Sequence, residues 1–299
     1  MLPASGLTLH VREATGADEL VVLEPSRSPL ATVVTLAGRL TTDSQGRTPA
    51  WEELPAADIG AIALTIRQAW LGERISTDAR CPSPGCLERM DVAFEIPAYI
   101  AHHRPRTYPG VRPGAEAGWF EFAAASKSFP ESESSPVPAL SESQVSPSSQ
   151  TSLSSQVSLS SRASLSSREA VSFRLPTIGD VRVATASADP ERSLRERCVR
   201  PANVSAAAAR RINRAMTALA PSLTEDVTVR CPACGGTDRL RFDPVSYSLA
   251  ELRDAASGLY EEVHLLASVF RWQEDAILGL PRSRRARYAN LIRRDKAAA

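Results

Sequence analysis

The sequence has few aromatic residues, no excess of either charge and no long hydrophobic run. Phe, Trp and Tyr make up 5% of the 299 residues, which predicts a core of aliphatic side chains and alanine. The 35 Lys and Arg residues nearly balance the 34 Asp and Glu residues, so no overall charge attracts nucleic acid or an acidic membrane. No stretch approaches the roughly 18 apolar residues of a membrane-spanning helix, and the first residues lack an export signal. We therefore expect a soluble, cytoplasmic protein without membrane contact.

Common catalytic motifs are also absent. The chain contains no Gly-x-Gly-x-x-Gly, Walker loop, Gly-x-Ser-x-Gly elbow or His-Glu-x-x-His. The neighbours His102 and His103 have no carboxylate close to them in sequence, and we interpret them as part of a solvated loop. A hydrolase with an unrecognised site would need converging polar residues that the sequence does not display. The sequence therefore predicts a protein that is not an enzyme.

A serine-rich segment, residues 126–170, divides the chain. Serine accounts for 19 of its 45 residues, a composition that cannot bury a hydrophobic core. Its three hexapeptide repeats are too few to stack as a β-helix. We predict residues 1–125 as an N-terminal half with one cysteine pair, residues 126–170 as a disordered insert, and residues 171–299 as a helical C-terminal half with a second pair.

Apolar spacing and capping residues predict an α+β fold with a mostly helical scaffold. One helix is expected between Asp58, as its N-cap, and Gly72, which stops it. In the C-terminal third, Ser248 and Glu251 match a capping box, which predicts one long helix from there to about Phe270. Further helices are predicted at residues 189–199, 203–221 and from 281 onward.

Four of the five cysteines occur as two similar pairs. Cys81 and Cys86 lie in the sequence RCPSPGC, and Cys231 and Cys234 lie in RCPACGG. Alternating apolar and polar residues flank each pair, which predicts antiparallel strands and places each pair at the tip of a β-hairpin. A hairpin tip that carries two cysteines is called a Cys knuckle, and two such knuckles supply the four sulfurs of a tetrahedral zinc site. The sequence therefore predicts a small antiparallel, zinc-ribbon-like sheet built from two distant Cys knuckles.

Four thiolate ligands would leave Zn²⁺ no open coordination position, so its predicted role is structural. Two alternatives stay open. Two unrelated pairs of buried cysteines would need no metal, and a thioredoxin-like redox pair would have to lie between a strand and a helix, which neither pair does. The fifth cysteine, Cys198, has no partner in sequence, and we expect it in the core.

The C-terminal residues combine aromatic and arginine side chains, which dominate many protein interfaces. Residues 281–296 hold seven basic residues and one acidic residue. We expect the last two long helices to pack as a hairpin whose edge binds a partner protein through Tyr260, Trp272, Arg284, Arg285 and Arg287. Two alternatives remain: the tryptophan fills the core beneath the hairpin, or the chain is a zinc-ribbon nucleic-acid-binding protein that uses the basic helix. The neutral overall charge disfavours nucleic acid as a partner.

Three segments resemble zinc-knuckle members of the baseplate proteins of contractile-tailed phages and related prophage-like particles. They are ISTDARCPSPGCLERMDVAFEI, RCPACGGTDRLRFDP and LYEEVHLLASVFRWQEDAILGLPRSRRARYANLI. The nearest group is the baseplate hub assembly chaperones of T-even-like phages. The resemblance implies a non-enzymatic assembly factor whose partners are baseplate hub or spike subunits. It would act in the cytoplasm of the producing bacterial cell, as a transient chaperone or as a retained part of the particle.

The chain departs from this family pattern at two places. Its first knuckle is Cys-x4-Cys where Cys-x2-Cys is more usual, which puts the sulfur geometry of that knuckle in question. The serine-rich insert is peculiar to this sequence.

Overall fold

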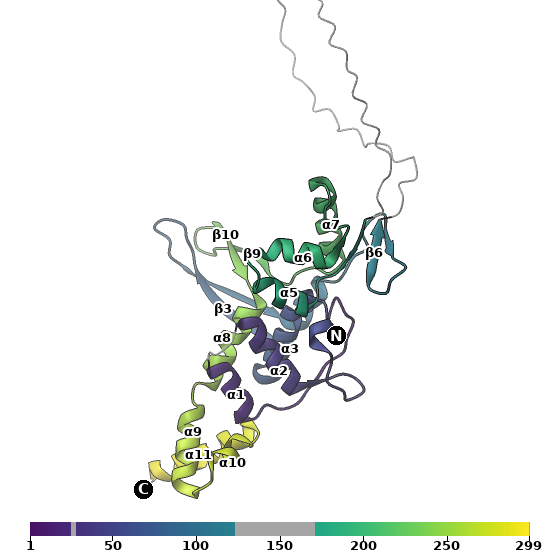
Figure 1. Ribbon diagram of the computed structural model, residues 1–299. Coiled ribbons are helices and arrows are strands. Elements are labelled where there is room, and N and C mark those ends of the chain that lie inside the picture. The colour runs from purple at the N-terminus through teal and green to yellow at the C-terminus, as the bar shows by residue number, and fades with distance from the viewer. Residues whose placement is uncertain (25–27, 123–170, 299) are drawn as a thin grey trace, which may run out of the picture.

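Figure 1 shows a computed structural model that describes residues 1–24, 28–122 and 171–298. These residues form an α+β fold, which confirms the predicted class, because helices dominate and the strands form small antiparallel sheets. The predicted disordered insert, residues 126–170, lies outside the described residues.

Helices occur along the whole described chain. The α-helices before the insert are α1 Gly16–Leu23, α2 Pro29–Leu40, α3 Ile59–Leu71 and α4 Ile96–His102, with the short 3-10 turns η1 Trp51–Glu53 and η2 Ala56–Asp58. Those after the insert are α5 Ile178–Thr185, α6 Pro190–Cys198, α7 Ala206–Leu219, α8 Pro244–Ala256, α9 Leu259–Phe270, α10 Glu274–Leu278 and α11 Arg282–Ala298.

The strands of the described residues form four separate antiparallel sheets. Three are two-stranded and pair β1 His10–Val11 with β2 Thr41–Thr42, β3 Arg74–Arg80 with β4 Arg89–Glu95, and β9 Glu225–Arg230 with β10 Thr237–Phe242. The fourth has the order β5 Val111–Pro113, β6 Trp119–Phe122, β7 Ser172–Arg174 and β8 Val199–Arg200.

The main hydrophobic core is centred on α3. Its side chains Ile62, Leu64 and Ile66 are at most 1% exposed. Helices α2 and α8 pack on α3, and α8 adds Leu249 and Leu252 to the same cluster. Elements from both sides of the insert therefore share one core.

The ends of α3 test the predicted helix directly. It stops at Gly72, as predicted, because this residue has a φ of 89° that favours glycine. Asp58 does precede the helix, but its carboxylate accepts hydrogen bonds from the backbone amides of Ala4 and Ser5 and does not cap α3. The expected N-cap interaction is wrong because the N-terminal segment of the chain uses this buried carboxylate.

Four aromatic side chains pack together at the bases of the β3–β4 and β9–β10 hairpins, where these hairpins join the main core. Phe94 at the end of β4 and Phe242 at the end of β10 have ring centroids 5.2 Å apart in an edge-on arrangement. Tyr99 of α4 and Tyr247 of α8 each lie within 5.4 Å of this pair. In a chain with few aromatic residues, this concentration indicates that the roots of the hairpins are firmly packed.

The four-stranded sheet and α7 form a second, smaller core. Phe173 of β7 packs with Ile212 and Ala215 of α7, and all three are at most 1% exposed. Strands β6 and β7 lie on either side of the insert in sequence and pair directly, with Glu121 opposite Ser172. The strands that flank the insert in sequence are therefore held next to each other.

A buried carboxylate organises the segment that follows β7. Asp180 of α5 accepts hydrogen bonds from Arg174 Nη2 and from the Thr177 backbone amide, both at 2.9 Å. Burial raises the pKa of Asp180, but the hydrogen bonds from Arg174 and Thr177 outweigh it and hold the pKa at about 2. The charged carboxylate is therefore the form that stabilises this part of the fold.

The long helix predicted from Ser248 to about Phe270 is two helices. α8 begins five residues earlier than predicted, because Asp243 caps it by accepting from the Val245 amide and Pro244 occupies the first turn. Ser248 is instead buried inside α8. The chain then breaks at Ser257 and Gly258 before α9 begins.

The helices after this break form an arm, residues 259–298, which extends from the body at the end of the molecule that holds the C-terminus (Figure 1). As predicted, α9 and α11 pack together. Between them lies the short helix α10, which ends at Gly279. The arm has its own small core of Leu266, Ile277 and Ile292. The arm therefore packs around its own small hydrophobic cluster, separate from the main core.

Arg285 was expected at the partner-binding edge, and this expectation is wrong. Its side chain is 2% exposed and forms a hydrogen-bonded ion pair with the buried carboxylate of Glu19 in α1. Arg285 Nε also donates to Glu262 of α9 at 2.8 Å. Burial raises the pKa of Glu19, and the attraction of Arg285 and Arg282 offsets this only in part. Arg285 therefore joins the arm to the body and does not face a partner.

We predict that Arg285→Ala lowers the free energy of unfolding by about 3–5 kcal/mol, because it leaves the Glu19 carboxylate buried without its main partner. The matched control is Arg284→Ala, which removes an exposed arginine one residue away and should change stability by about 0.5 kcal/mol or less. Urea unfolding of both variants measures the difference. Equal effects of the two substitutions would contradict the role assigned to Arg285.

A second prediction concerns acid. Because the pKa of Asp180 is lower in the folded than in the unfolded chain, its contribution to stability is present above about pH 4 and is lost as the pH falls toward 2. Asp180→Asn should therefore be clearly less stable than the wild type at pH 7, and this gap should narrow by pH 3. Chemical unfolding at both pH values gives the gap. An unchanged gap would show that the ionisation of Asp180 does not matter.

Candidate metal centre

The two cysteine pairs lie at the tips of two antiparallel hairpins, as the sequence predicts. β3 and β4 pair from Arg74 opposite Glu95 up to Arg80 opposite Arg89, so Cys81 and Cys86 fall in the turn between them. β9 and β10 pair up to Arg230 opposite Thr237, which leaves residues 231–236 as the second turn. Each pair is therefore presented by strands whose register is fixed.

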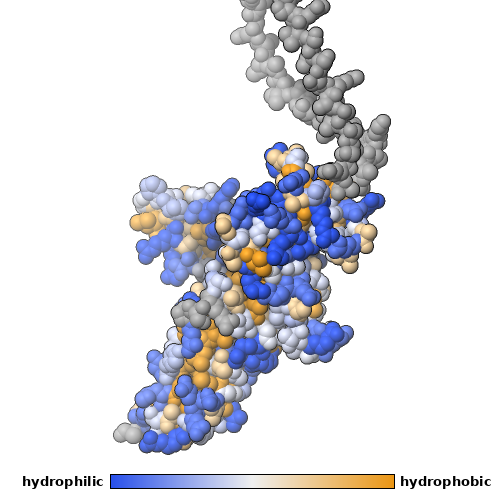
Figure 2. All heavy atoms as spheres, in the orientation of Figure 1, coloured by the Kyte–Doolittle hydropathy of each residue, from blue (hydrophilic) through white to orange (hydrophobic). Residues whose placement is uncertain are grey.

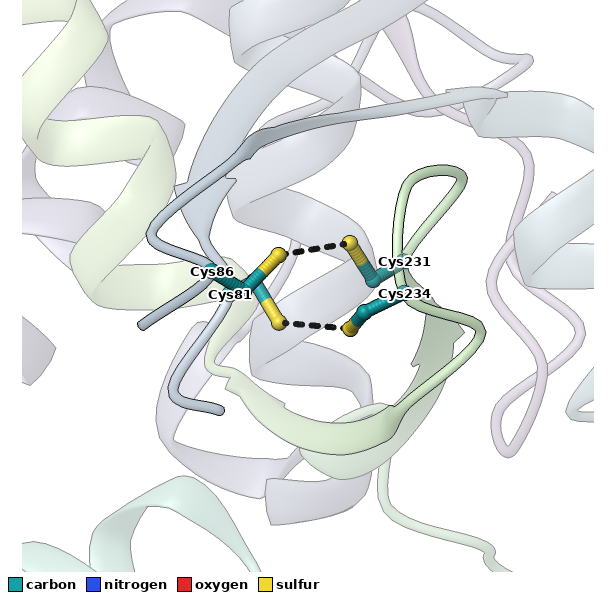
Figure 3. A group of neighbouring side chains, drawn as sticks. All are labelled: Cys81, Cys86, Cys231 and Cys234. Carbon is teal, nitrogen blue, oxygen red and sulfur yellow. Dashed lines mark hydrogen bonds between the residues drawn. The ribbon is translucent and has the colours of Figure 1, made fainter. Parts of the chain in front are cut away.

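The four sulfurs converge on one point, although the two pairs are about 150 residues apart in sequence (Figure 3). The Sγ atoms of Cys81 and Cys234 are 3.6 Å apart, and those of Cys86 and Cys231 are 3.7 Å apart. All four Sγ atoms lie within 4.8 Å of one another. The predicted convergence of Cys81, Cys86, Cys231 and Cys234 is thus what the structure contains.

The backbone of each knuckle forms a tight turn. The Cys81 amide donates to the Glu88 carbonyl and the Cys231 amide donates to the Gly236 carbonyl, both at 2.8 Å. Gly85 has a φ of 80°, which a glycine adopts without strain. Gly236 is needed for space, because a Cβ there would lie 2.7 Å from Ser83 Oγ of the other knuckle and 3.2 Å from the Cys234 sulfur.

Hydrogen bonding favours a thiolate at one of the four cysteines, Cys234, whereas the pKa of the neighbouring Cys86 thiol is raised to about 12. Cys81 and Cys231 are each 1% exposed and pack on Met90 of β4, whereas Cys234 lies at the surface. The Gly236 amide donates to the Cys234 sulfur at 3.4 Å, and this bond and the Ser83 hydroxyl lower the pKa of the Cys234 thiol to about 6. One ligand of the cluster is therefore available in its metal-binding form at neutral pH.

The donor set fits a tetrahedral metal ion. With metal–sulfur bonds of about 2.3 Å, the sulfurs of a tetrahedral site lie roughly 3.8 Å apart, close to the two separations above. Four thiolates attract soft or borderline metals such as zinc or iron rather than calcium or magnesium. The four cysteines therefore form a site that can hold a metal, and the longer spacing of the first knuckle does not prevent their convergence.

The residues expected to bind a partner lie on the arm but not at one place. Trp272 is 37% exposed, and Arg284 and Arg287 of α11 are exposed as well. Tyr260 is 53% exposed but lies ten residues before the end of α9, about 15 Å along the helix, next to His264 and Arg293. The structure thus brings Trp272 and Arg284 toward one region and leaves Tyr260 outside it.

Three aromatic residues of the arm, two of them exposed and the third half-buried, form what we call the aromatic cluster: Phe270, Trp272 and Tyr288. The rings of Phe270 and Trp272 stack at 4.9 Å, and Trp272 meets Tyr288 edge-on at 5.4 Å. The guanidinium of Arg284 lies 5.7 Å from the Tyr288 ring. On the face shown in Figure 2, hydrophobic residues gather where the body meets the arm, over α1 and α9.

Sequence reasoning missed Phe270 as a member of this cluster. Its spacing along α9 predicts a buried residue, but the side chain is 41% exposed. Arg271, with a left-handed φ of 58°, reverses the chain and stacks Trp272 on Phe270. The helical spacing carries no signal for this reversal.

The expected solvated histidine loop is only half right. His102 is exposed, but His103 is 8% exposed at the end of α4. Its Nδ1 lies 2.9 Å from the Tyr99 carbonyl, and its Nε2 lies 3.3 Å from the carboxylate of Glu225. The partner was missed because it is distant in sequence. Cys198 is 2% exposed, as predicted for a core cysteine.

Comparison with known proteins adds no identification. No family model, no curated protein and no solved structure matches the chain. Within the residues that the structure describes, no helix is long and apolar enough to cross a membrane. Functional inference therefore starts from the metal centre and the arm themselves.

Proposed function

We propose that the chain is a non-enzymatic assembly factor that acts through protein contacts and whose fold is stabilised by one structural zinc ion. The observation that carries this proposal is the convergence of four cysteine sulfurs, from two hairpins far apart in sequence, within 4.8 Å of one another. Four protein ligands complete a tetrahedral shell, so the ion has no position for a substrate or a water molecule. Such a site supports a fold and does no chemistry.

Zinc is the metal that we propose for this site. It favours tetrahedral thiolate coordination, and structural zinc contributes on the order of 10 kcal/mol to folding in zinc-finger peptides. The two hairpins belong to separate sheets, and β4 and β9 make only limited contact with each other. A metal bond between their tips would therefore add a rigid connection that packing alone does not supply.

For the partner, we propose a baseplate hub or spike subunit of a contractile-tailed phage or a prophage-like particle. The resemblance of the knuckles and the C-terminal segment to baseplate assembly proteins suggests this class. The aromatic cluster beside Arg284 is consistent with it, because aromatic and arginine side chains contribute much of the energy at protein interfaces. The arm extends away from the metal centre and is accessible to such a partner (Figure 1).

Nucleic-acid binding is the second candidate function. The observation that favours it is a set of exposed basic residues on α11: Arg284, Arg287, Arg293, Arg294 and Lys296. Binding of this kind would weaken steeply as salt increases. Titration of generic DNA at two salt concentrations separates it from the first proposal.

The zinc proposal predicts one zinc ion per purified chain by elemental analysis. Cys86→Ser and Cys234→Ser should each reduce zinc occupancy and lower the thermal midpoint by roughly 10 °C or more, since about 1 kcal/mol corresponds to 2–4 °C in a protein of this size. Cys198→Ser is the matched control, because this cysteine lies outside the cluster and its loss should leave zinc content unchanged. A wild-type chain without zinc would refute the metal proposal.

The partner proposal predicts that Trp272→Ala weakens co-purification with a hub or spike subunit by at least tenfold. The expected loss reflects the removal of a half-exposed aromatic anchor. Val183→Ala, an exposed apolar residue on α5, is the control and should bind as the wild type does. Zinc content should be the same in both variants. Normal binding by Trp272→Ala would place the partner site elsewhere.

A further inference from the structure

A concave site that neither the metal centre nor the arm uses lies between α4 and α7. It has a volume of about 510 Å³ and is lined by the end of α4, the loop that follows, one face of α7 and the start of β9. Sites for small ligands typically occupy about 300–1,000 Å³. The cleft is therefore large enough for a small molecule.

Three arginines are among the residues that line this cleft, whose exposed surface is otherwise mostly apolar. Arg104 and Arg106 project from the loop after α4, Arg214 comes from α7, and His102 lies at the end of α4. The carboxylate that borders the cleft, Glu225, is 3.3 Å from the imidazole of His103 and faces that ring. The cleft is thus lined by three arginines and by one carboxylate that already has a neighbour.

These three arginines are exposed and carry no carboxylate partner among the described residues, unlike buried or half-buried arginines of the protein. Arg67 and Arg174, for example, each pair with a carboxylate. Within the described ranges of the chain, neither Arg104, Arg106 nor Arg214 lies within 4.0 Å of any carboxylate oxygen. Three guanidiniums in one cleft repel one another unless an anion lies between them.

The backbone holds these groups in place. The Arg106 amide donates to the Ala218 carbonyl of α7 at 2.7 Å, which ties the loop to the helix that carries Arg214. On the other side, the Tyr99 hydroxyl donates to the Leu223 carbonyl, which ties α4 to the segment leading into β9. The two walls of the cleft are therefore fixed relative to each other before any ligand arrives.

We propose that this cleft binds the phosphate group of a small phosphorylated molecule. A phosphate carries close to two negative charges at neutral pH and offers three acceptor oxygens. The guanidinium group of arginine can donate two parallel hydrogen bonds to the oxygens of a phosphate, and several guanidinium groups can bind the same phosphate. A single carboxylate would leave most of the positive charge of Arg104, Arg106 and Arg214 uncompensated. The site is separate from the proposed zinc ion and from the aromatic cluster.

The test uses the full-length, metal-loaded protein and pyrophosphate as the probe, titrated by calorimetry at about 0.15 M salt so that weak surface attraction is screened. We expect saturable binding at one site. The double variant Arg104→Gln, Arg106→Gln should weaken it at least tenfold, and so should Arg214→Gln. The three side chains are exposed, so zinc content and the thermal midpoint should not change.

The control variant is Arg293→Gln, Arg294→Gln, which removes the same two charges from the exposed face of α11. It has the same metal centre, so any heat from contact of pyrophosphate with zinc is common to all variants. Unchanged binding by this control supports the cleft. An equal loss in the control, no saturable binding by the wild type, or binding of a glutamate-rich peptide in place of pyrophosphate would overturn the proposal.

Discussion

The two cysteine hairpins meet because one buried arginine ties their roots together. Arg67, near the end of α3, donates to Glu251 of α8 at 2.7 Å and to the carbonyl oxygens of Gly72 and Arg74. α3 leads into β3, and β10 leads into α8, so this one side chain fixes the start of the first hairpin against the end of the second. The aromatic residues packed at the roots then leave the hairpins little freedom to diverge. These contacts hold the roots of the two hairpins together, and the tips are the part that a bound metal would connect.

The sequence predicted the two cysteine knuckles well because the geometry of each knuckle is encoded locally. Each knuckle carries its own proline, glycine and alternating strands, so the turn and the direction of both thiols depend on residues only a few positions away. The same holds for the end of α3 at Gly72 and for the class of the fold. Local patterns of this kind can be recognised in a single sequence, without knowing which distant residues contact one another in the folded protein.

Three of the errors share a different physical origin, which is a partner far away in the chain. Arg285 looked like an exposed interface residue because Glu19, its counter-ion, is 266 positions distant. Glu251 looked like part of a capping box, but its carboxylate pairs with Arg67 from another helix. His103 looked solvated because Glu225 is remote in sequence. A polar contact between residues far apart in sequence leaves no periodic pattern in the sequence. A residue that forms such a contact is therefore easily predicted to lie on the surface.

The pairing of β6 with β7 has a consequence for how the chain tolerates change. Glu121 and Ser172 are opposite each other in the sheet, and the sheet continues on either side of them into β5 and β8. The distance between the two ends of the intervening segment is therefore set by strand pairing and not by how many residues that segment contains. A loop closed in this way can lengthen or shorten at little entropic cost, because the cost grows only with the logarithm of its length. The junction is accordingly a natural place in this protein to splice in a fluorescent domain or an affinity tag.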